Sequence, residues 1–593
     1  MRIFFIINIL FCFQVGFSQN LSVARNYYEQ GKLEKALVSY QELYAKNKAN
    51  SQVIIGLAKT YRQLEEYNKA VELLKTSFKN NKTRLEFLLE LGVTHNINKN
   101  TEKANAVFDD VIEYTKKTPN RASYIARMFQ SYNLLKPSIE CFRIAMDSNS
   151  VLNYDLEIGR MYGELGEYYE MFDSYLEYML NKPAYMVNIK RRLDEFITDD
   201  PENEANIIFR KTLLRKNQTK PDILYNELLS WMFSQQKQFK KSFLQEKAIY
   251  AKTEDGIPQI TNLAMNAKEN GDYDTAKDAL NFVITKSEQE NYTINAHVQL
   301  QRLLIEQSNK KQYADINKNY ESLINNYGKS RKTLNLLLDY AHFLGFKQDQ
   351  KKQAENFLKP LLKERFSKIE KAKIEILLAD ILILNNKFNQ ALIYYTRAKK
   401  KIKNHPLSQE ASFKIAKASY YKGDFDWAKT QLNVLKASTT QLIANDAMQL
   451  ALVIEDNTQE DSTFTALKLY AKAELYTFQE QPEKAMDVYT KLTRDYKGNS
   501  IEDDALFKQA KLYLTSNKTE EAITCFQKII NFFPNSLLAD DTYFELGNLY
   551  TSQGNVDKAK DNFEQIIFNH ADSIYYVEAR KTYRKLRGDH LIN

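Results

Sequence analysis

The chain has 593 residues, and its 83 lysines and arginines nearly balance 75 aspartates and glutamates, giving a net charge of +8. The two signs are interspersed along the sequence, which argues against the basic stripe of a nucleic-acid-binding protein. Only 16 glycines and 10 prolines occur, as expected for a chain that is almost entirely helical. We therefore expect no nucleic-acid partner.

Residues 1–18 have the features of a secretory signal peptide. Arg2 precedes an apolar run at residues 3–13, and the small residues Gly16 and Ser18 stand just before the expected cleavage site. We expect cleavage after Ser18 and export of the mature chain. A buried first helix is one alternative. Lipidation of Cys12 is another, although a large residue precedes this cysteine where a lipidation signal has a small one.

The mature chain is expected to have no transmembrane segment. No later stretch approaches about 18 consecutive apolar residues, the length that indicates a spanning helix. Membrane association is then expected only through a partner. Cleavage leaves Cys141 and Cys525, each of which follows closely after one of the regularly spaced residues described next. We interpret both as buried small side chains, with redox chemistry as the alternative.

Mostly small residues recur along the chain at a nearly fixed interval, and we call them the ladder residues. They are Ala36, Ala70, Ala104, Ser138, Met171, Ala205, Ser242, Ala276, Ile316, Ala354, Ala391, Ala428, Ala485, Ala522 and Ala559. The interval is near 34 at the start and 37 beyond Ala391, with one step of 57 between Ala428 and Ala485. Apolar residues at helical spacing stand on both sides of each clear ladder residue, which predicts pairs of helices joined by tight turns.

These units resemble the tetratricopeptide repeat, whose period is about 34 residues. In the last unit Gly547 and Tyr550 precede a turn at Gly554, and Ala559 and Phe563 follow it, as the family pattern requires. The resemblance covers nearly all of residues 20–571. It implies an all-α fold, a right-handed superhelix (α-solenoid) of antiparallel helix pairs.

The C-terminal repeats also resemble the longer repeats of periplasmic outer-membrane assembly and cell-envelope coordination proteins. That resemblance places the exported chain in the periplasm, or on the periplasmic face of the outer membrane, of a Gram-negative bacterium. Serines and acidic residues precede the helices of this part, for example at residues 500–504 and 536–541. Such residues suit helix N-termini without any catalytic role.

Departures from the regular spacing predict a division of the chain into seven parts. Residues 184–260 lose the aromatic and glycine positions and are basic, and the long step between Ala428 and Ala485 holds an additional apolar helix near residues 442–454 with an acidic loop at 455–461. The predicted parts are a signal peptide (1–18), an N-terminal array (19–183), degenerate basic repeats (184–260), a central array (261–436), the extra helix and acidic loop (437–462), a C-terminal array (463–571) and a capping helix (572–593).

Residue patterns typical of catalysis are absent from the sequence. The six histidines are scattered, with no H-x-x-x-H or C-x-x-C pair, and no glycine-rich phosphate loop or G-x-S-x-G motif occurs. We therefore expect a protein that is not an enzyme and that needs no cofactor or metal. An enzyme hidden in residues 184–260 would lack a recognisable nucleophile, base and ligand set.

Partner binding is expected on the concave face, which the resemblance assigns to the first helix of each pair. The ninth, twelfth and thirteenth places of the family pattern point inward there. The residues at these places with side chains suited to binding are Arg25, Tyr28, Lys59, Arg62, Arg160, Lys417, Tyr420, Tyr421, Glu474, Phe478, Lys511 and Asn548. Cations beside aromatic rings can hold a peptide. The alternative is that they are ordinary solvated positions.

The sequence thus predicts an exported, non-catalytic scaffold that mediates protein–protein interaction in the bacterial cell envelope. A glycan- or peptidoglycan-binding protein on the same repeats is the alternative. Sugar sites favour exposed aromatic platforms, and Trp231 and Trp427 are the two tryptophans. Trp427 precedes Ala428 within a second helix, where a structural role is expected.

Overall fold

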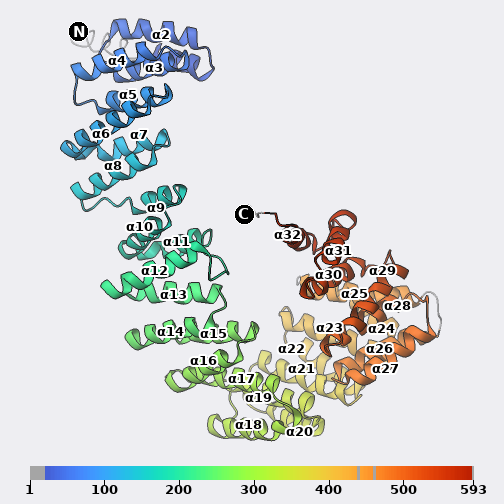
Figure 1. Cartoon of the computed structure of the whole chain (residues 1–593). Helices are drawn as coiled ribbons and strands as arrows, with labels where there is room; N and C mark the ends of the chain where they lie inside the picture. Colours follow the sequence, from blue (N-terminus) through green and yellow to red (C-terminus); the bar gives the residue numbers. More distant parts are fainter. Residues whose placement is uncertain (1–19, 437–440, 459–462, 590–593) are drawn as a thin grey trace, which may run out of the picture. The chain divides into compact units, whose positions relative to one another are not determined.

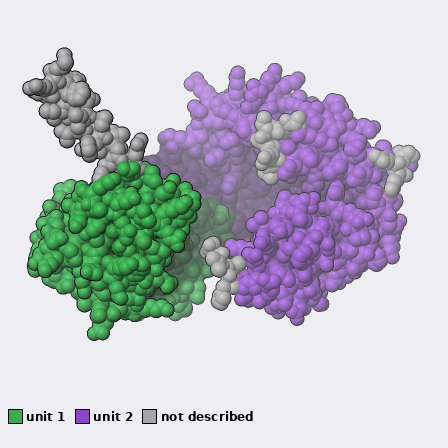
Figure 2. All heavy atoms as spheres, turned by 90° about the horizontal axis from the view of Figure 1, so that it is seen from above, with its two compact units in different colours: residues 1–276 green, residues 277–593 purple. Residues whose placement is uncertain are grey.

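The computed structural model describes residues 20–436, 441–458 and 463–589. The predicted signal peptide, Cys12 and residues 459–461 of the acidic loop lie outside these ranges. Every regular element in the described ranges is helical, as predicted. The chain divides into two compact units, residues 1–276 and 277–593, which Figure 2 colours separately.

Unit 1 consists of consecutive helices, of which Figure 1 labels α2 to α15. They are a helical segment at residues 20–29, α2 (Leu33–Lys46), α3 (Ser51–Gln63), α4 (Tyr67–Asn80), α5 (Leu85–Ile97), α6 (Thr101–Lys117), η1 (Pro119–Arg121), α7 (Ala122–Ser131), α8 (Leu135–Ser148), α9 (Asp155–Glu164), α10 (Tyr168–Asn181), η2 (Pro183–Tyr185), α11 (Met186–Leu193), α12 (Glu204–Thr219), α13 (Ile223–Gln235), α14 (Phe239–Thr253) and α15 (Ile257–Glu269). The next helix, α16 (Tyr273–Lys286), contains the boundary between the units.

Unit 2 continues the alternation of helices. It contains α17 (Glu290–Gln307), η3 (Lys310–Gln312), α18 (Tyr313–Tyr327), α19 (Leu334–His342), the π-helical η4 (Phe343–Lys347), α20 (Lys351–Leu361), α21 (Lys368–Leu384), α22 (Phe388–Lys401), α23 (Pro406–Lys422), α24 (Phe425–Leu435), α25 (Gln441–Thr458), α26 (Thr465–Phe478), α27 (Pro482–Asp495), α28 (Glu502–Thr515), α29 (Thr519–Phe532), α30 (Ala539–Ser552), α31 (Val556–Asn569) and α32 (Tyr576–Arg587).

All fifteen ladder residues lie in the second helix of a pair, and each has an exposed fraction of 6 % or less. Two of them carry a hydroxyl that must be hydrogen-bonded when buried. Ser138 Oγ donates to the carbonyl of Ala126 at 2.8 Å, and Ser242 Oγ donates to that of Ser230 at 3.0 Å. Each acceptor belongs to the first helix of the same pair. The prediction of helix pairs that meet at small residues is therefore confirmed.

The turn between the two helices of a pair has a recurring backbone conformation. The residue five positions before the ladder residue has a positive φ in most units, including Gly31 (70°), Glu65 (60°) and Asn133 (56°). Glycine adopts this conformation at little cost, whereas it is unfavourable for other residues. Because glutamate and asparagine adopt it here, the packing of the helix pair, and not glycine alone, fixes the turn.

A glycine in a first helix allows an aromatic ring of the second helix to pack closely. A Cβ atom added at Gly92 of α5 would lie 2.4 Å from Cε1 of Phe108 in α6. Phe108 is 4 % exposed and packs against Phe129, with ring centroids 5.5 Å apart. Small residues at this place therefore set the separation of the two helices, as the repeat pattern predicts.

Residues 184–260 form helices although their repeat motif is weak. The first helix α11 is short, at 8 residues, and the buried Asn206 of α12 donates to the carbonyl of Thr198 at 3.0 Å in the loop between them. Pro201 and Pro221 lie outside the helices, shortly before α12 and α13. The predicted seven-part division of the chain stays a prediction.

The long step between Ala428 and Ala485 contains the additional helix predicted there, observed as α25. Its residues Ala447, Ala451 and Ile454 are fully buried and join the core formed by α23, α24 and α26. Beyond it, the side-chain amide of Gln479 at the end of α26 donates to Asn386 Oδ1, which follows α21, at 3.0 Å. α26 is therefore connected both to its sequence neighbours and to a pair much earlier in the chain.

Candidate partner-binding surface

The first helices of unit 1 form a hollow that brings together three of the predicted binding residues, Arg25, Tyr28 and Lys59. It has a volume of about 580 Å³, with Tyr40 at its base. Tyr40 is 5 % exposed, and burial raises the pKa of its hydroxyl. Gly56 of α3 makes room for this ring, because an added Cβ would lie 2.4 Å from Tyr40 Cε1.

The cations of this hollow are open to solvent. Arg25 Nε pairs with Glu29 Oε1 at 2.8 Å, and the hydrogen bond to this carboxylate raises the pKa of Arg25. Lys59 Nζ lies 4.0 Å from Glu90 Oε1, and its side chain is 39 % exposed. Exposed pairs of this kind exchange readily with water and with other partners. The hollow can therefore offer two cations beside an aromatic ring.

Arg62 is not part of this open surface, which corrects the expectation that it faces a partner. Its side chain is 5 % exposed, and its Nη1 lies 2.7 Å from Glu90 Oε2. Tyr132, which follows α7, donates its hydroxyl to Glu90 Oε1 at 2.6 Å, and burial raises the pKa of that hydroxyl. The guanidinium thus joins three consecutive first helices, α3, α5 and α7, and is held by the protein itself.

Three predicted aromatic residues, Tyr420, Tyr421 and Phe478, also serve the packing of the chain. Tyr420 is fully buried, and burial raises the pKa of the hydroxyls of Tyr420 and Tyr421. The Phe478 ring of α26 packs against Tyr421 and Phe346, with centroids 6.0 and 5.8 Å apart. The expected aromatic surface is therefore an internal contact between α23, α26 and η4.

Lys417 and Glu474 line a smaller and more polar hollow of about 220 Å³ between α23, α25, α26 and α28. The Nζ of Lys508 from α28 lies 3.9 Å from Glu474 Oε1, so this carboxylate is weakly paired. Lys417 lies over the Tyr421 ring, with its Nζ 5.6 Å from the centroid. These two predicted residues come together although α24 and α25 stand between their helices in the chain.

The remaining three predicted residues do not line these hollows. Arg160 Nε lies 3.5 Å from Glu164 on the same helix, and its side chain is about half exposed. Lys511 Nζ pairs with Glu545 of α30 at 2.8 Å. Asn548 is exposed on α30.

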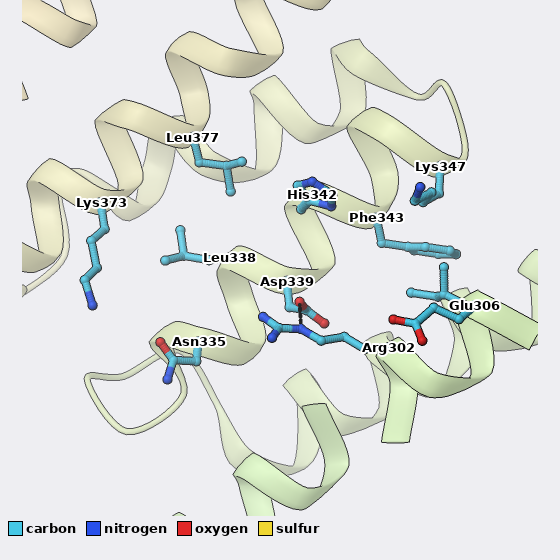
Figure 3. Close-up of a pocket in the computed structure, with 11 residues that line it drawn as sticks. Arg302, Glu306, Asn335, Leu338, Asp339, His342, Phe343, Lys347, Lys373 and Leu377 are labelled. Atoms are coloured by element: carbon cyan, nitrogen blue, oxygen red, sulfur yellow. Dashed lines mark hydrogen bonds and ion pairs between the residues drawn. The ribbon is translucent and has the colours of Figure 1, made fainter. Parts of the chain in front are cut away.

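A hollow of about 630 Å³ in unit 2 contains none of the predicted residues (Figure 3). It is formed by the first helices α17, α19 and α21, with Leu338 and Leu377 pointing toward one another in its apolar part. Arg302 Nε pairs with Asp339 Oδ1 at 2.6 Å, and the buried Tyr320 donates its hydroxyl to Asp339 Oδ2. Lys347 Nζ pairs with Glu480 at 2.8 Å.

Among the described residues that line the unit 2 hollow, Lys373 is exposed and has no ion pair, whereas the exposed Arg302 is paired with Asp339. The exposed Asn335 lines the same hollow. If a ladder residue is counted as the twentieth place of the family pattern, Lys373 stands at the second place of its unit. The predicted residues came from the ninth, twelfth and thirteenth places. Gln52, which lines the unit 1 hollow, also stands at a second place. A polar or basic residue at the second place of a first helix is therefore the sequence feature that could have located the unit 2 hollow.

The described residues contain no group of three or more His, Cys, Asp or Glu side chains placed to hold a metal ion. Cys141 and Cys525 are both free and buried, and burial raises the pKa of their thiols to about 12 and about 11. Such thiols are poor nucleophiles at neutral pH, which supports their interpretation as buried small side chains. In the part of the chain that the structure covers, no helix is long and apolar enough to cross a membrane.

Family models of the tetratricopeptide repeat match residues 27–86, 504–536 and 540–567. These segments are therefore tetratricopeptide repeats, as predicted, and they lie near both ends of the chain. No curated protein matches the chain in sequence.

Two solved structures align over nearly the full length of the chain. One is of Naa15/Naa10 bound to HypK-THB, with 11% identity, 96% of each chain covered and a TM-score of 0.24. The other is of the APC/C hetero-tetramer Cut9-Hcn1, with 12% identity, 94% of this chain and 95% of that chain covered and a TM-score of 0.24. TM-scores this low carry no conclusion about the present chain.

Proposed function

We propose that this chain is an exported, non-catalytic scaffold that binds segments of protein partners on its first-helix face in the bacterial cell envelope. The observation that carries the proposal is the pair of hollows, one in each unit, lined mainly by first helices of the repeat. Each combines apolar or aromatic side chains with at least one exposed cation, a combination suited to an acidic peptide with apolar residues. Tetratricopeptide repeats at both ends of the chain support the same function.

Charge reversal in each hollow tests this proposal. Lys59→Glu in unit 1 and Lys373→Glu in unit 2 should each reduce the recovery of cross-linked protein partners from envelope fractions. Lys35→Glu and Lys400→Glu, at exposed lysines of second helices, are matched controls that should leave recovery unchanged. Equal recovery by all four variants, or recovery of glycan without protein, would contradict the proposal.

Export can be tested separately from binding. Mass spectrometry of the mature chain should find Gln19 at its N-terminus, with the protein in the periplasmic fraction or released from membranes without detergent. A retained residue 1, or an acylated Cys12 in a membrane-bound chain, would overturn this part of the proposal. The binding proposal does not depend on which of these N-termini is found.

A second candidate function, glycan binding, is favoured by a hollow around Trp231 in unit 1. The hollow has a volume of about 520 Å³, and Glu227, Asn262 and Asn266 line it together with the Trp231 ring. An aromatic platform beside carboxylate and amide groups is suited to a sugar ring. Trp231→Ala should abolish retention on peptidoglycan or another envelope glycan if this function holds. Trp427→Ala is the control, because Trp427 is half exposed on the second helix α24 and lies outside the hollow.

A further inference from the structure

The helix α25 interrupts the alternation of first and second helices. It forms one side of a groove that the repeated helix pairs alone would not form. Its residues Ala447, Ala451 and Ile454 are buried, whereas Met448 and Leu452 on an adjoining side of the helix are 45 % and 37 % exposed. Residues at i and i+4 lie on the same face of a helix. α25 therefore presents a short apolar strip that packing within the described chain leaves uncovered.

This strip faces a groove of about 490 Å³ that is closed on the other side by the N-terminal ends of α28 and α30. Leu537 and Leu538, in the loop before α30, add further apolar surface, and Leu537 is 72 % exposed. An apolar side chain this exposed gains little in a monomer and would gain free energy if a partner covered it. The groove lies outside the two hollows proposed above to bind protein segments.

The charge of the groove is strongly one-sided. Among the described residues, its lining contains four aspartates and no lysine, arginine or histidine, in a chain whose net charge is +8. Asp503 accepts a hydrogen bond from Ser536 and Asp541 accepts one from Tyr575, at 2.5 and 2.8 Å. Acidic residues in the first turn of a helix are favourable in themselves, so these two aspartates have a structural explanation.

Asp456 and Asp504 are the other two groove aspartates, and Asp504 also lies in the first turn of α28. Unlike Asp503 and Asp541, neither carboxylate has a hydrogen-bond or ion-pair partner within the described ranges, although Asp504 is partly buried between the groove and the adjoining hollow at Glu474. Burial, reinforced by Asp503 and Glu474, raises the pKa of Asp504 to about 8. A partly buried carboxyl without a partner is unfavourable in its charged form, and a cation from outside would stabilise that form.

We propose that the groove between α25, α28 and α30 binds a basic amphipathic segment of a partner protein. Apolar side chains of that segment lie against Met448, Leu452 and Leu537, and a lysine or arginine faces Asp504. Charge complementarity selects this occupant, since an acidic or purely apolar segment would leave Asp456 and Asp504 without a partner and the acidic groove without a counter-charge. The chain would thus hold one partner segment here and others on its first-helix face.

A synthetic probe tests this site directly. The probe is a fluorescein-labelled peptide of about four helical turns, with leucines at i and i+4 and arginines beside them. It is titrated with the full mature chain and followed by anisotropy. We expect saturable binding, and no binding of a matched peptide in which glutamates replace the arginines. Asp504→Asn and Leu537→Ser should each weaken binding by roughly tenfold, the loss typical of one enclosed charge pair or apolar contact.

Matched controls separate this site from general attraction to an acidic surface. Asp557→Asn removes an exposed carboxylate of α31, and Val434→Ser removes an exposed apolar side chain of α24, both outside the groove. Both should bind the probe like the unchanged chain. Equal affinity of all four variants would overturn the proposal. Concentration-dependent self-association that Asp504→Asn abolishes would overturn it as well, because the occupant would then be a second copy of this chain.

A pH titration gives a second readout that a merely structural role of Asp504 would not produce. The groups that face its carboxyl are Asp503 and Lys508 of α28, Glu474 of α26 and Asp456 of α25. An arginine in the groove pairs with the ionised form of Asp504, so the affinity for the probe should rise from pH 7 to pH 9. The rise should disappear in Asp504→Asn, and its persistence there would contradict the assigned pairing.

Discussion

Glu90 of α5 is buried and Asp504 of α28 is partly buried, and both stand on first helices, but only Glu90 has partners within the described chain. Arg62 and Tyr132 come from the helix pairs on either side of Glu90 and occupy both of its oxygens. Asp504 faces two hollows, and no described residue pairs with its carboxylate. Burial of a carboxylate therefore does not by itself identify it as a binding group. The adjacent helix pairs determine whether the carboxylate already has a hydrogen-bond or ion-pair partner.

Removing Glu90 should have the largest effect on stability. Glu90→Ala leaves the Arg62 guanidinium buried without its counter-ion, and breaking a buried pair in this way costs about 3–5 kcal/mol. Hydrogen exchange measured by mass spectrometry should show faster exchange in α3, α5 and α7, with the helices of unit 2 unchanged. Exchange rates equal to those of the unchanged chain would contradict the structural role of Glu90.

The close packing of α3, the helix that carries Arg62, can be tested at Gly56. In Gly56→Ala the new methyl group collides with the buried Tyr40 ring, and overpacking of this kind costs about 1–3 kcal/mol. Urea denaturation followed by circular dichroism measures the loss. The same change in a Tyr40→Leu background should cost less, because the ring atoms that it meets are gone. Equal costs in both backgrounds would contradict this contact.

Asp504 should affect stability with the opposite sign from Glu90, and in a pH-dependent way. Its pKa is raised from 3.8 to about 8 in the folded chain, so between these values the folded state binds more protons than the unfolded state. Stability attributable to this group therefore falls as the pH rises from 4 to 8. Asp504→Asn should match the unchanged chain near pH 4 and melt about 2 °C higher at pH 8.

Differential scanning calorimetry at the two pH values measures this difference. Asp557→Asn, at an exposed carboxylate, should show the same pH dependence as the unchanged chain. A lower melting temperature of Asp504→Asn at pH 8 would indicate that Asp504 has a partner within the chain.

The exposed pair of Arg25 and Glu29 should have the smallest effect. Glu29→Gln removes an ion pair whose two side chains are 74 % and 58 % exposed, and water screens a pair of this kind so well that it contributes little to stability. The urea midpoint should therefore stay within the error of the unchanged chain. A large loss would mean that Arg25 is a structural residue like Arg62 and is not available to a partner.

The sequence predicted the helix pairs because each ladder residue reflects a packing requirement within its own helix pair. A small side chain suits the position where a second helix packs closely against its own first helix, and all fifteen positions, including Met171 and Ile316, are buried. The turn before each second helix and the close approach at Gly92 follow from the same local geometry. Tetratricopeptide family models recognise only some of these units, but the spacing extends through the whole described chain.

The sequence located the candidate binding surface only in part. Arg25, Tyr28 and Lys59 do meet in one hollow, since they occupy consecutive first helices in the expected register. The unit 2 hollow was missed because its exposed lysine, Lys373, stands nearer to the start of its helix than the places that were considered. Its other cations, such as Arg302, are paired within the chain.

By itself, the sequence determined which segments form helices, which helices pair and which residues lie between them, because these features depend on contacts within a single repeat. Only the tertiary structure decided which charged groups and aromatic rings remain available to a partner. Arg62 is occupied by a glutamate of the next helix pair, and Tyr421 is covered by a phenylalanine that follows the inserted helix. The groove beside α25 likewise exists because that helix packs against α24 and approaches the ends of α28 and α30. No periodicity within a single repeat encodes that arrangement.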